Sequence, residues 1–344
     1  MLSLASDEGR EQQQDWMTVF EANLESAGMT SAAGYDPEAR KWVMLVGTFK
    51  GRIHRVQYPA ASPGQSEPVL EVQSNNSSSV LGLQLSKDVI YWRQGNAIYS
   101  RNLHTGESGG PMFALPYTSF ACGDCGVKIA SIGREVDLFH DEDLDADGSL
   151  QVVQRYVLHG LVLSVLFANG RALAHTSNQL CVWETSKLVV EVANSSKMFA
   201  CAALGESKVL LGCNDGNCVL VEFANPIERT LFGHIKNVRS VQITKDDTKG
   251  VSASWDCTVR VWDLVRYTCL RVIPALHQQY ITSLCLLGKD ESFVLTTSSD
   301  KTCKMTDLYR SDRERLLRFV IHVDSYRPHL PVDVLVIVKS LLFA

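Results

Sequence analysis

The chain has 344 residues, of which 45% are hydrophobic and 21% are charged. This composition is typical of a globular protein and excludes a wholly disordered chain, which would be poorer in apolar residues. The 33 basic and 38 acidic residues give a formal charge of -5, so no global positive field draws nucleic acid or an anionic membrane to the protein.

The two ends of the chain carry no pattern typical of a targeting or membrane-spanning segment. Residues 1–14 are expected to be a flexible N-terminus, and their acidic residues stand where a secretory signal needs a basic start and an apolar run. The apolar residues 332–344 contain Lys339 and are too short to cross a bilayer as a helix.

Ten cysteines are scattered along the sequence and show no disulfide framework. Cysteines within apparent strands are typical of buried, reduced thiols in an intracellular protein. We therefore expect a cytoplasmic or nuclear location. The cysteines placed in apparent strands are Cys201, Cys257, Cys285 and Cys303.

Short runs of alternating apolar and polar residues follow one another along the chain and predict β-strands. Turn-forming residues separate them, for example Gln94-Gly95-Asn96 and the run 214–217. No stretch has a long helical period. In chain order, the strand–turn–strand segments are residues 43–56, 89–100, 129–139, 172–184, 210–223, 252–264 and 294–308.

These segments form a repeat. Placing Asp256 on Asp300 aligns Ser252 with Thr296, and the position of Trp262 can then be followed through the chain. The spacing of about 40 to 45 residues matches one four-stranded propeller blade per repeat. The seven corresponding positions are Val56, Ser100, Phe139, Trp183, Val221, Trp262 and Thr306.

The sixth repeat carries the most distinctive residues: Gly233-His234, then Ser252, Ser254 and Asp256 at alternate positions, then Trp262-Asp263. This pattern resembles the WD40 repeat family. The resemblance implies an all-β, seven-bladed WD40 β-propeller over residues 15–323, with a divergent N-terminal half held together mainly by apolar packing. Residues 324–344 would form a C-terminal tail without an assigned role.

Propellers of this family usually complete one blade with strands from both chain ends, which removes a free sheet edge. Residues 16–20 could supply the outer strand of the seventh blade, and Leu316–Val323 could fill the same place. We favour the N-terminal segment because that arrangement is common in the family.

The resemblance assigns a structural tetrad to the sixth blade: His234, Ser252, Asp256 and Trp262, with Ser254 as the alternative hydroxyl. Buried polar groups must satisfy one another's hydrogen bonds, so these residues would stabilise the blade. The other interpretation of a Ser, a His and an Asp is a hydrolase site, but the G-x-S-x-G pattern of a nucleophile elbow does not occur. We expect no enzymatic activity and no catalytic residues.

Two patterns could bind metal. Asp143, Asp145 and Asp147 alternate as in a calcium loop, although Gln154 replaces the expected Glu, so a solvated acidic loop is the alternative. Cys122 and Cys125 have the spacing of half a zinc site, but no second ligand pair follows. No other cofactor is predicted.

The residue before each turn Asp faces the broad top surface in this family. Trp and Arg are typical anchors of protein interfaces, so this set predicts a protein- or peptide-binding surface. The alternative for Trp255 is a residue that merely recurs at this turn in the family. The set is Phe49, Arg93, Ile132, Thr176, Asn214, Trp255 and Ser299.

The predicted function is a non-catalytic scaffold or subunit of an intracellular multiprotein complex that binds other proteins through the top face and rim. Direct nucleic-acid binding, a small-molecule substrate and a membrane span are not expected. The alternative is a substrate receptor of a cullin-type ubiquitin ligase, because Trp262–Arg266 resembles the W-D-x-R element of such receptors, with Arg266 one place late.

Overall fold

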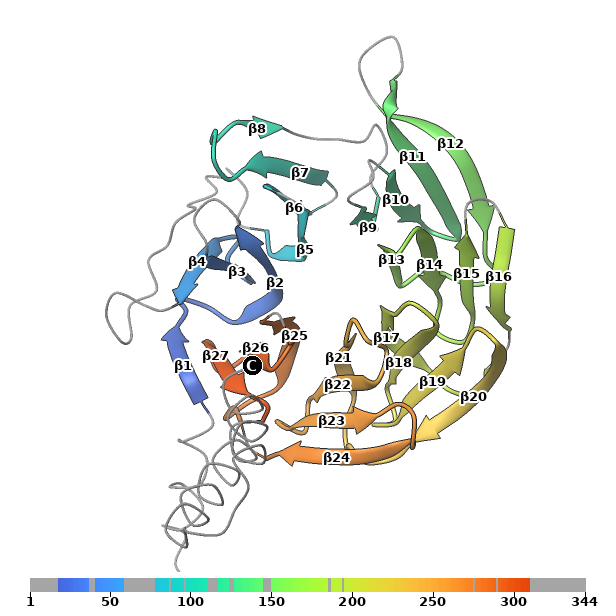
Figure 1. Cartoon of the computed structure of the whole chain (residues 1–344). Helices are drawn as coiled ribbons and strands as arrows, with labels where there is room; N and C mark the ends of the chain where they lie inside the picture. Colours follow the sequence, from blue (N-terminus) through green and yellow to red (C-terminus); the bar gives the residue numbers. More distant parts are fainter. Residues whose placement is uncertain are drawn as a thin grey trace, which may run out of the picture.

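The computed structural model describes residues 18–36, 41–58, 78–86, 88–95, 97–109, 117–123, 127–144, 150–184, 187–193, 195–274, 276–288 and 290–309. Over these residues the elements are 27 β-strands in seven antiparallel sheets, which follow one another around a ring (Figure 1). This arrangement confirms the predicted all-β, seven-bladed propeller. Within the described ranges, the search for a helix long and apolar enough to cross a membrane finds none.

The first four blades take up the N-terminal half of the ring. Blade one has three described strands, and blades two to four have four strands each. Their strands are β2 (Gly28–Asp36), β3 (Lys41–Thr48) and β4 (Ile53–Tyr58); β5 (Val80–Ser86), β6 (Val89–Gln94), β7 (Ala97–Asn102) and β8 (Ser108–Gly109); β9 (Ser119–Cys122), β10 (Val127–Ile132), β11 (Glu135–Leu144) and β12 (Leu150–Val157); and β13 (Ser164–Ala168), β14 (Arg171–His175), β15 (Leu180–Glu184) and β16 (Lys187–Val192).

Blades five to seven complete the ring. In every blade the first strand lies innermost and each later strand lies further out (Figure 1). Their strands are β17 (Phe199–Leu204), β18 (Lys208–Cys213), β19 (Cys218–Glu222) and β20 (Asn225–Leu231); β21 (Val238–Ile243), β22 (Lys249–Ser254), β23 (Val259–Asp263) and β24 (Thr268–Ile273); and β25 (Ile281–Leu287), β26 (Phe293–Ser298) and β27 (Thr302–Asp307), with β1 (Thr18–Asn23) outermost in blade seven.

The seven positions aligned with Trp262 all lie on the third strand of their blade, which confirms the repeat. In blade six Trp262 pairs with Gly250, and in blade one Val56 pairs with Met44. One detail of the sequence interpretation is wrong: Cys257 does not lie in a strand. It lies in the hairpin after β22, with a φ of 66°.

The N-terminal strand β1 closes the ring, as we favoured from the sequence. It runs antiparallel to β27, with Ala22 opposite Cys303 and Asn23 opposite Thr302. The backbone N–H of Leu24 continues the contact by donating to the carbonyl of Lys301 at 2.6 Å. The competing segment Leu316–Val323 lies outside the described residues, as do residues 1–14 and the tail 324–344.

The described core consists of seven apolar clusters, one at each seam between neighbouring blades. At the closing seam, Ala22 and Leu24 from the start of the chain pack with Met44 of blade one and Met305 of blade seven. Each blade therefore buries its apolar surface against both neighbours. The resulting stability depends on closure of the whole ring.

Polar bonds also join the innermost strands of neighbouring blades. The Ser31 and Ser283 hydroxyls lie 2.9 Å apart across the seam between blades one and seven. The Leu284 N–H donates to Ser240 Oγ at 3.1 Å across the next seam. These bonds hold the inner strands in register around the centre of the ring.

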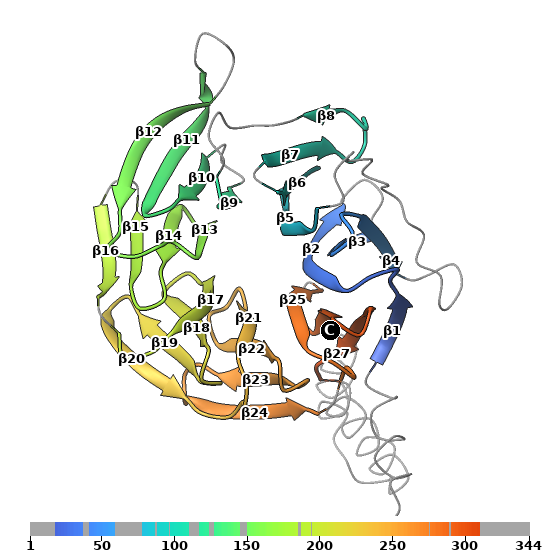
Figure 2. The same ribbon diagram turned by 180° about the vertical axis from the view of Figure 1, so that it is seen from behind.

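The ring has two faces, which are seen from opposite sides in Figures 1 and 2. We define the top face by the hairpins between second and third strands and by the connections that lead from each blade to the next. We define the bottom face by the hairpins between first and second strands and between third and fourth strands. Trp255 lies in a top-face hairpin, and Lys245 lies in a bottom-face hairpin.

Candidate functional site

The four residues assigned to the tetrad lie in one hydrogen-bonded chain in blade six. Trp262 Nε1 donates to Ser252 Oγ at 2.8 Å, and this hydroxyl lies 2.8 Å from His234 Nε2. On the other side of the imidazole ring, Nδ1 lies 2.9 Å from Asp256 Oδ2. These hydrogen bonds link four parts of the blade: the connection before β21, strand β22, the hairpin after β22, and strand β23.

Asp256 ties this hairpin to the preceding connection. Its carboxylate accepts from the N–H of Ile235 at 3.1 Å and from the N–H and hydroxyl of Thr258 at 3.0 and 2.7 Å. Burial alone would raise the pKa of Asp256, but the hydrogen bonds from His234 and Thr258 hold that pKa well below its usual value. Ser252 is fully buried, and its hydroxyl contacts both His234 and Trp262.

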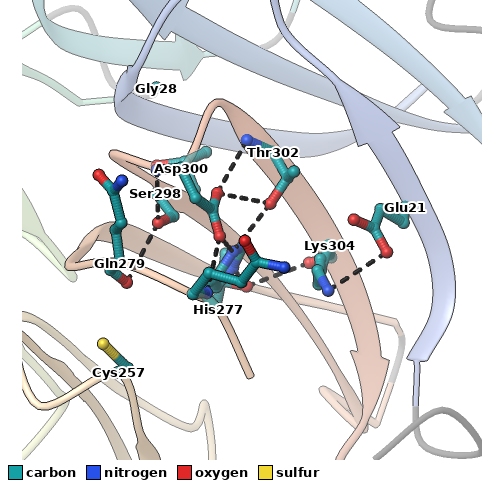
Figure 3. A network of polar contacts seen from close by, with 12 residues as sticks. Glu21, Gly28, Cys257, His277, Gln279, Ser298, Asp300, Thr302 and Lys304 are labelled. Atoms are coloured by element: carbon teal, nitrogen blue, oxygen red, sulfur yellow. Dashed lines mark hydrogen bonds and ion pairs between the residues drawn. The ribbon is translucent and has the colours of Figure 1, made fainter. Parts of the chain in front are cut away.

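Blade seven contains a related network, shown in Figure 3. His277 Nδ1 lies 3.1 Å from Asp300 Oδ2, and its Nε2 lies 2.8 Å from Thr296 Oγ1. The N–H of Gln278 donates to the same carboxylate at 3.0 Å. Thr306 stands where blade six has Trp262, and its buried hydroxyl has no partner within the described residues. The Thr296 hydroxyl donates to the carbonyl of Lys304 at 3.3 Å, so the network continues to the backbone of β27 without an aromatic donor.

The top-face set predicted from the sequence divides into two groups, and hairpin length is the reason. In blades one, five, six and seven the paired strands enclose the same length of hairpin, as between Ala253 and Val259. In blades two, three and four the hairpin is shorter, since Gln94 pairs with Ala97, Ile132 with Glu135 and His175 with Leu180. Each predicted residue lies seven positions before the residue aligned with Trp262. In blades two and three, where the hairpin is shorter, that position falls on the second strand.

Three members of the set are therefore placed differently from the prediction. Thr176 is fully buried, and its Oγ1 accepts from the Gln179 N–H at 3.0 Å. Ile132 is half-buried at the end of β10 and packs on an apolar cluster. Arg93 lies within β6, in a blade remote along the ring from Trp255. Thr176 and Ile132 thus add little exposed side chain to the top face, and Arg93 is separated from Trp255 along the ring.

Four members of the set occupy equivalent hairpin positions on the top face. Phe49 is 59% exposed, Asn214 is exposed, and Trp255 and Ser299 are half-exposed. Asn214 and Trp255 belong to adjacent blades, and the Asn237 side chain donates to Asn214 Oδ1 at 3.2 Å between them. Blades five to seven thus bring part of the predicted surface together.

Trp255 is part of a larger cluster that the sequence interpretation missed. Its ring stacks on Tyr280 from the next connection, with centroids 5.2 Å apart and planes 24° apart. Arg239 lies over Trp255 and Lys236 over Tyr280, each 5.5 Å from the ring centroid. We call these four residues the aromatic–cation cluster. Lys236, Arg239 and Trp255 belong to blade six and the connection before it, whereas Tyr280 comes from the connection to blade seven, so the packing of these segments brings the cluster together.

An ion pair between a buried carboxylate and an exposed arginine in blade three was also missed. Asp137 is fully buried, and Arg155 of β12 donates to its two oxygens at 2.6 and 2.9 Å. Tyr117 Oη donates to the same carboxylate at 2.6 Å. No sequence motif marks these residues, because Arg155 and Tyr117 lie 18 and 20 residues away from Asp137 along the chain.

The metal predictions fall largely outside the described residues. Asp145, Asp147 and Cys125 are not described, and for Asp143 only the backbone of β11 is. Among the described residues, no group of three or more His, Cys, Asp or Glu could hold a metal ion. The calcium loop stays a prediction.

Arg266, which suggested the ubiquitin-ligase alternative, lies in the bottom-face hairpin after β23. Its Nη1 donates to Asp263 Oδ2 at 3.0 Å, and its backbone N–H donates to Oδ1 of the same residue at 2.7 Å. These bonds give Arg266 a local role in the hairpin. The alternative stays a prediction.

Comparison with protein families identifies the two blades that carry these networks. The family model described as WD domain, G-beta repeat matches residues 226–263 and 267–307. The chain is a β-propeller that contains WD40 repeats. WD40 propellers generally mediate protein–protein interactions and are typically non-catalytic.

Curated relatives match this WD40 propeller over part of its length. Pre-mRNA-processing factor 19 of Bos taurus is 32% identical over 103 residues, which are 30% of this chain and 20% of that protein. Protein ROOT INITIATION DEFECTIVE 3 of Arabidopsis thaliana is 26% identical over 181 residues, which are 47% of this chain and 41% of that protein. The matches thus span less than half of the length of these relatives.

Among solved structures, the computationally designed Ika8 protein is similar to the WD40 propeller with a TM-score of 0.60 and 15% sequence identity. The alignment covers 83% of this chain and 98% of the designed one. At this identity the likeness shows the fold alone.

Proposed function

We propose that this propeller is a non-catalytic subunit or scaffold of an intracellular multiprotein complex, in the cytoplasm or nucleus, and that it binds protein or peptide partners through the top face of blades five to seven. The observation that carries the proposal is the stacked pair of Trp255 and Tyr280, which is partly exposed on this face. Large aromatic side chains are typical anchors of protein interfaces.

The rigidity of this surface supports the proposal. Trp255 precedes Asp256, whose carboxylate is bound by four donors, and Tyr280 follows the His277 network of blade seven. The two anchors are thus fixed before a partner arrives, which lowers the entropic cost of binding. Exposed Ile235 and Met198 add apolar side chains to the same face, in the connections that lead into blades six and five.

The test is a comparison of partner capture. In quantitative affinity purification, we expect the double variant Trp255→Ala with Tyr280→Ala to recover at least tenfold less partner protein than the wild type. The reason is that two anchors, each contributing about 1 to 2 kcal/mol to binding, would be removed. The melting temperature should stay close to that of the wild type, since both side chains are partly exposed.

The matched control is Ile227→Ala with Val265→Ala, which removes two exposed apolar side chains on the bottom-face side (58% and 60% exposed). It should capture the wild-type partners. Equal recovery by the Trp255/Tyr280 variant and the control would refute the proposal.

A further inference from the structure

Among the described residues, the bottom-face hairpins between first and second strands differ in charge from the top face. Within the same described ranges these hairpins are acidic, with Lys245 as their exposed cation. Several of these acids have internal partners: Asp247 accepts from the Ser207 N–H and hydroxyl, and Glu291 accepts from the Lys245 N–H at 2.7 Å. The acidic residues are Asp88, Glu206, Asp246, Asp247, Asp290 and Glu291.

The top face carries cations instead. In its described hairpins and connections, the exposed Glu25 is paired with Arg52, and Asp215 with Lys197 at 3.3 Å. Within the described part of the chain, six basic side chains on or beside this face have no carboxylate partner. They are Lys50, Arg93, Arg134, Lys236, Arg239 and Lys301.

Three of these cations lie on the top face of blades six and seven. Lys236 and Arg239 are exposed and belong to the aromatic–cation cluster, and Lys301 is exposed in the hairpin that follows β26. The nearby Asp256 and Asp300 are turned inward, with side chains only 4% and 7% exposed, and are bound by His234 and His277. The surface therefore presents positive charge while its carboxylates are engaged inside the blades.

Resting on the function proposed above, we infer that the aromatic–cation cluster binds an acidic segment of the partner protein, rich in Asp and Glu. The carboxylates of such a segment complement the positive charges of Lys236 and Arg239. The rings of Trp255 and Tyr280 supply apolar contact for the aliphatic parts of the Asp and Glu side chains. Arg239 projects from the innermost strand β21, so the acidic segment lies across the mouth of the central channel.

The geometry favours an acidic peptide over a single-stranded nucleic acid. Nucleic-acid platforms offer free aromatic faces on which bases stack. Here Trp255 and Tyr280 stack on each other, and a cation lies over each ring. A base could stack only by displacing a ring or a cation, whereas a carboxylate can bind the cations where they are.

The test uses the full chain and a fluorescein-labelled peptide composed of Asp, Glu and Gly, with fluorescence anisotropy as the readout. The same peptide with Asn and Gln in place of the acids tests the charge, and a labelled single-stranded RNA of equal length tests the other class of ligand. We expect the acidic peptide to bind at least tenfold more tightly than either, and its affinity to fall as salt screens the cations.

Lys236→Glu with Arg239→Glu should weaken binding of the acidic peptide by at least tenfold. The matched control is Lys187→Glu with Lys245→Glu, which changes the net charge equally at exposed bottom-face positions and should bind as the wild type does. Equal loss in both variants, or tighter binding of the RNA, would overturn the inference. If the Lys236/Arg239 variant still captures cellular partners that the Trp255/Tyr280 variant loses, the inference of an acidic partner segment is wrong, but the proposed function stands.

Discussion

At the scale of single residues, the same polar group can stabilise a blade or contribute little, depending on its burial and its partners. Asp256 is 4% exposed and has four donors, whereas Asp215 at the equivalent place in blade five is 46% exposed and bound to Lys197 and Asn217. A buried group that loses its partner is costly, while an exposed ion pair contributes little.

Replacing Asp256 by Ala should lower the free energy of unfolding by about 1 to 3 kcal/mol, because His234 and the Ile235 N–H would lose their acceptor. Urea denaturation followed by tryptophan fluorescence measures the change. Asp215→Ala is the matched control and should cost less than about 1 kcal/mol. Similar losses in the two variants would show that the tetrad does not stabilise blade six.

At the scale of elements, strand β1 has the largest expected effect on stability. It covers the edge of β27 and sends Ala22 and Leu24 into the apolar cluster between blades seven and one. Without it, β27 would expose unpaired backbone groups, and the seam would lose apolar contacts that no other described strand supplies.

Deletion of residues 1–23 should lower the free energy of unfolding by roughly 3 kcal/mol or more, from lost apolar burial and lost backbone hydrogen bonds. Differential scanning calorimetry measures the effect. Deletion of residues 1–14 keeps β1 and should leave the melting temperature nearly unchanged. A full-length melting temperature after the longer deletion would mean that another segment closes the ring.

At the scale of the whole molecule, buried titratable groups in three blades have pKa values that are shifted in the same direction, downward. His175 of blade four is fully buried, and burial lowers its pKa to about 4 despite the bond to the Thr176 carbonyl. In blades six and seven, hydrogen bonds outweigh burial and hold the pKa values of Asp256 and Asp300 well below the usual value. Each folded-state pKa is thus lower than in the unfolded chain.

Protonation of these groups therefore favours the unfolded state. The histidine and the two aspartates lose their contributions to stability in different pH ranges. The stability linked to His175 is fully present above its unfolded pKa of 6.5 and is lost as pH falls toward 4. The stability linked to the two aspartates is lost only below about pH 4. In urea titrations, His175→Leu should remove about 2 to 3 kcal/mol of the stability difference between pH 7 and about pH 4.5. An unchanged pH profile in this variant would contradict the assignment.

The sequence by itself determined the fold. Turns and strands recur at a spacing set by the length of one four-stranded blade, so the third strands of even the divergent blades could be located from Trp262. The tetrad could be assigned for a similar reason, because His234, Ser252, Asp256 and Trp262 lie within one repeat. Local spacing is enough where one blade contains the whole arrangement.

Only the tertiary structure decided the surface. Ile132 and Thr176 were misplaced because the hairpins of blades three and four are shorter than that of blade six, by three residues and one residue, and even a one-residue difference moves a side chain to another environment. The stack of Trp255 on Tyr280 and the cations over it come from adjacent blades, and the partner of Asp137 lies on another strand. Contacts across a seam or between strands depend on packing, which the spacing of residues within a repeat does not encode.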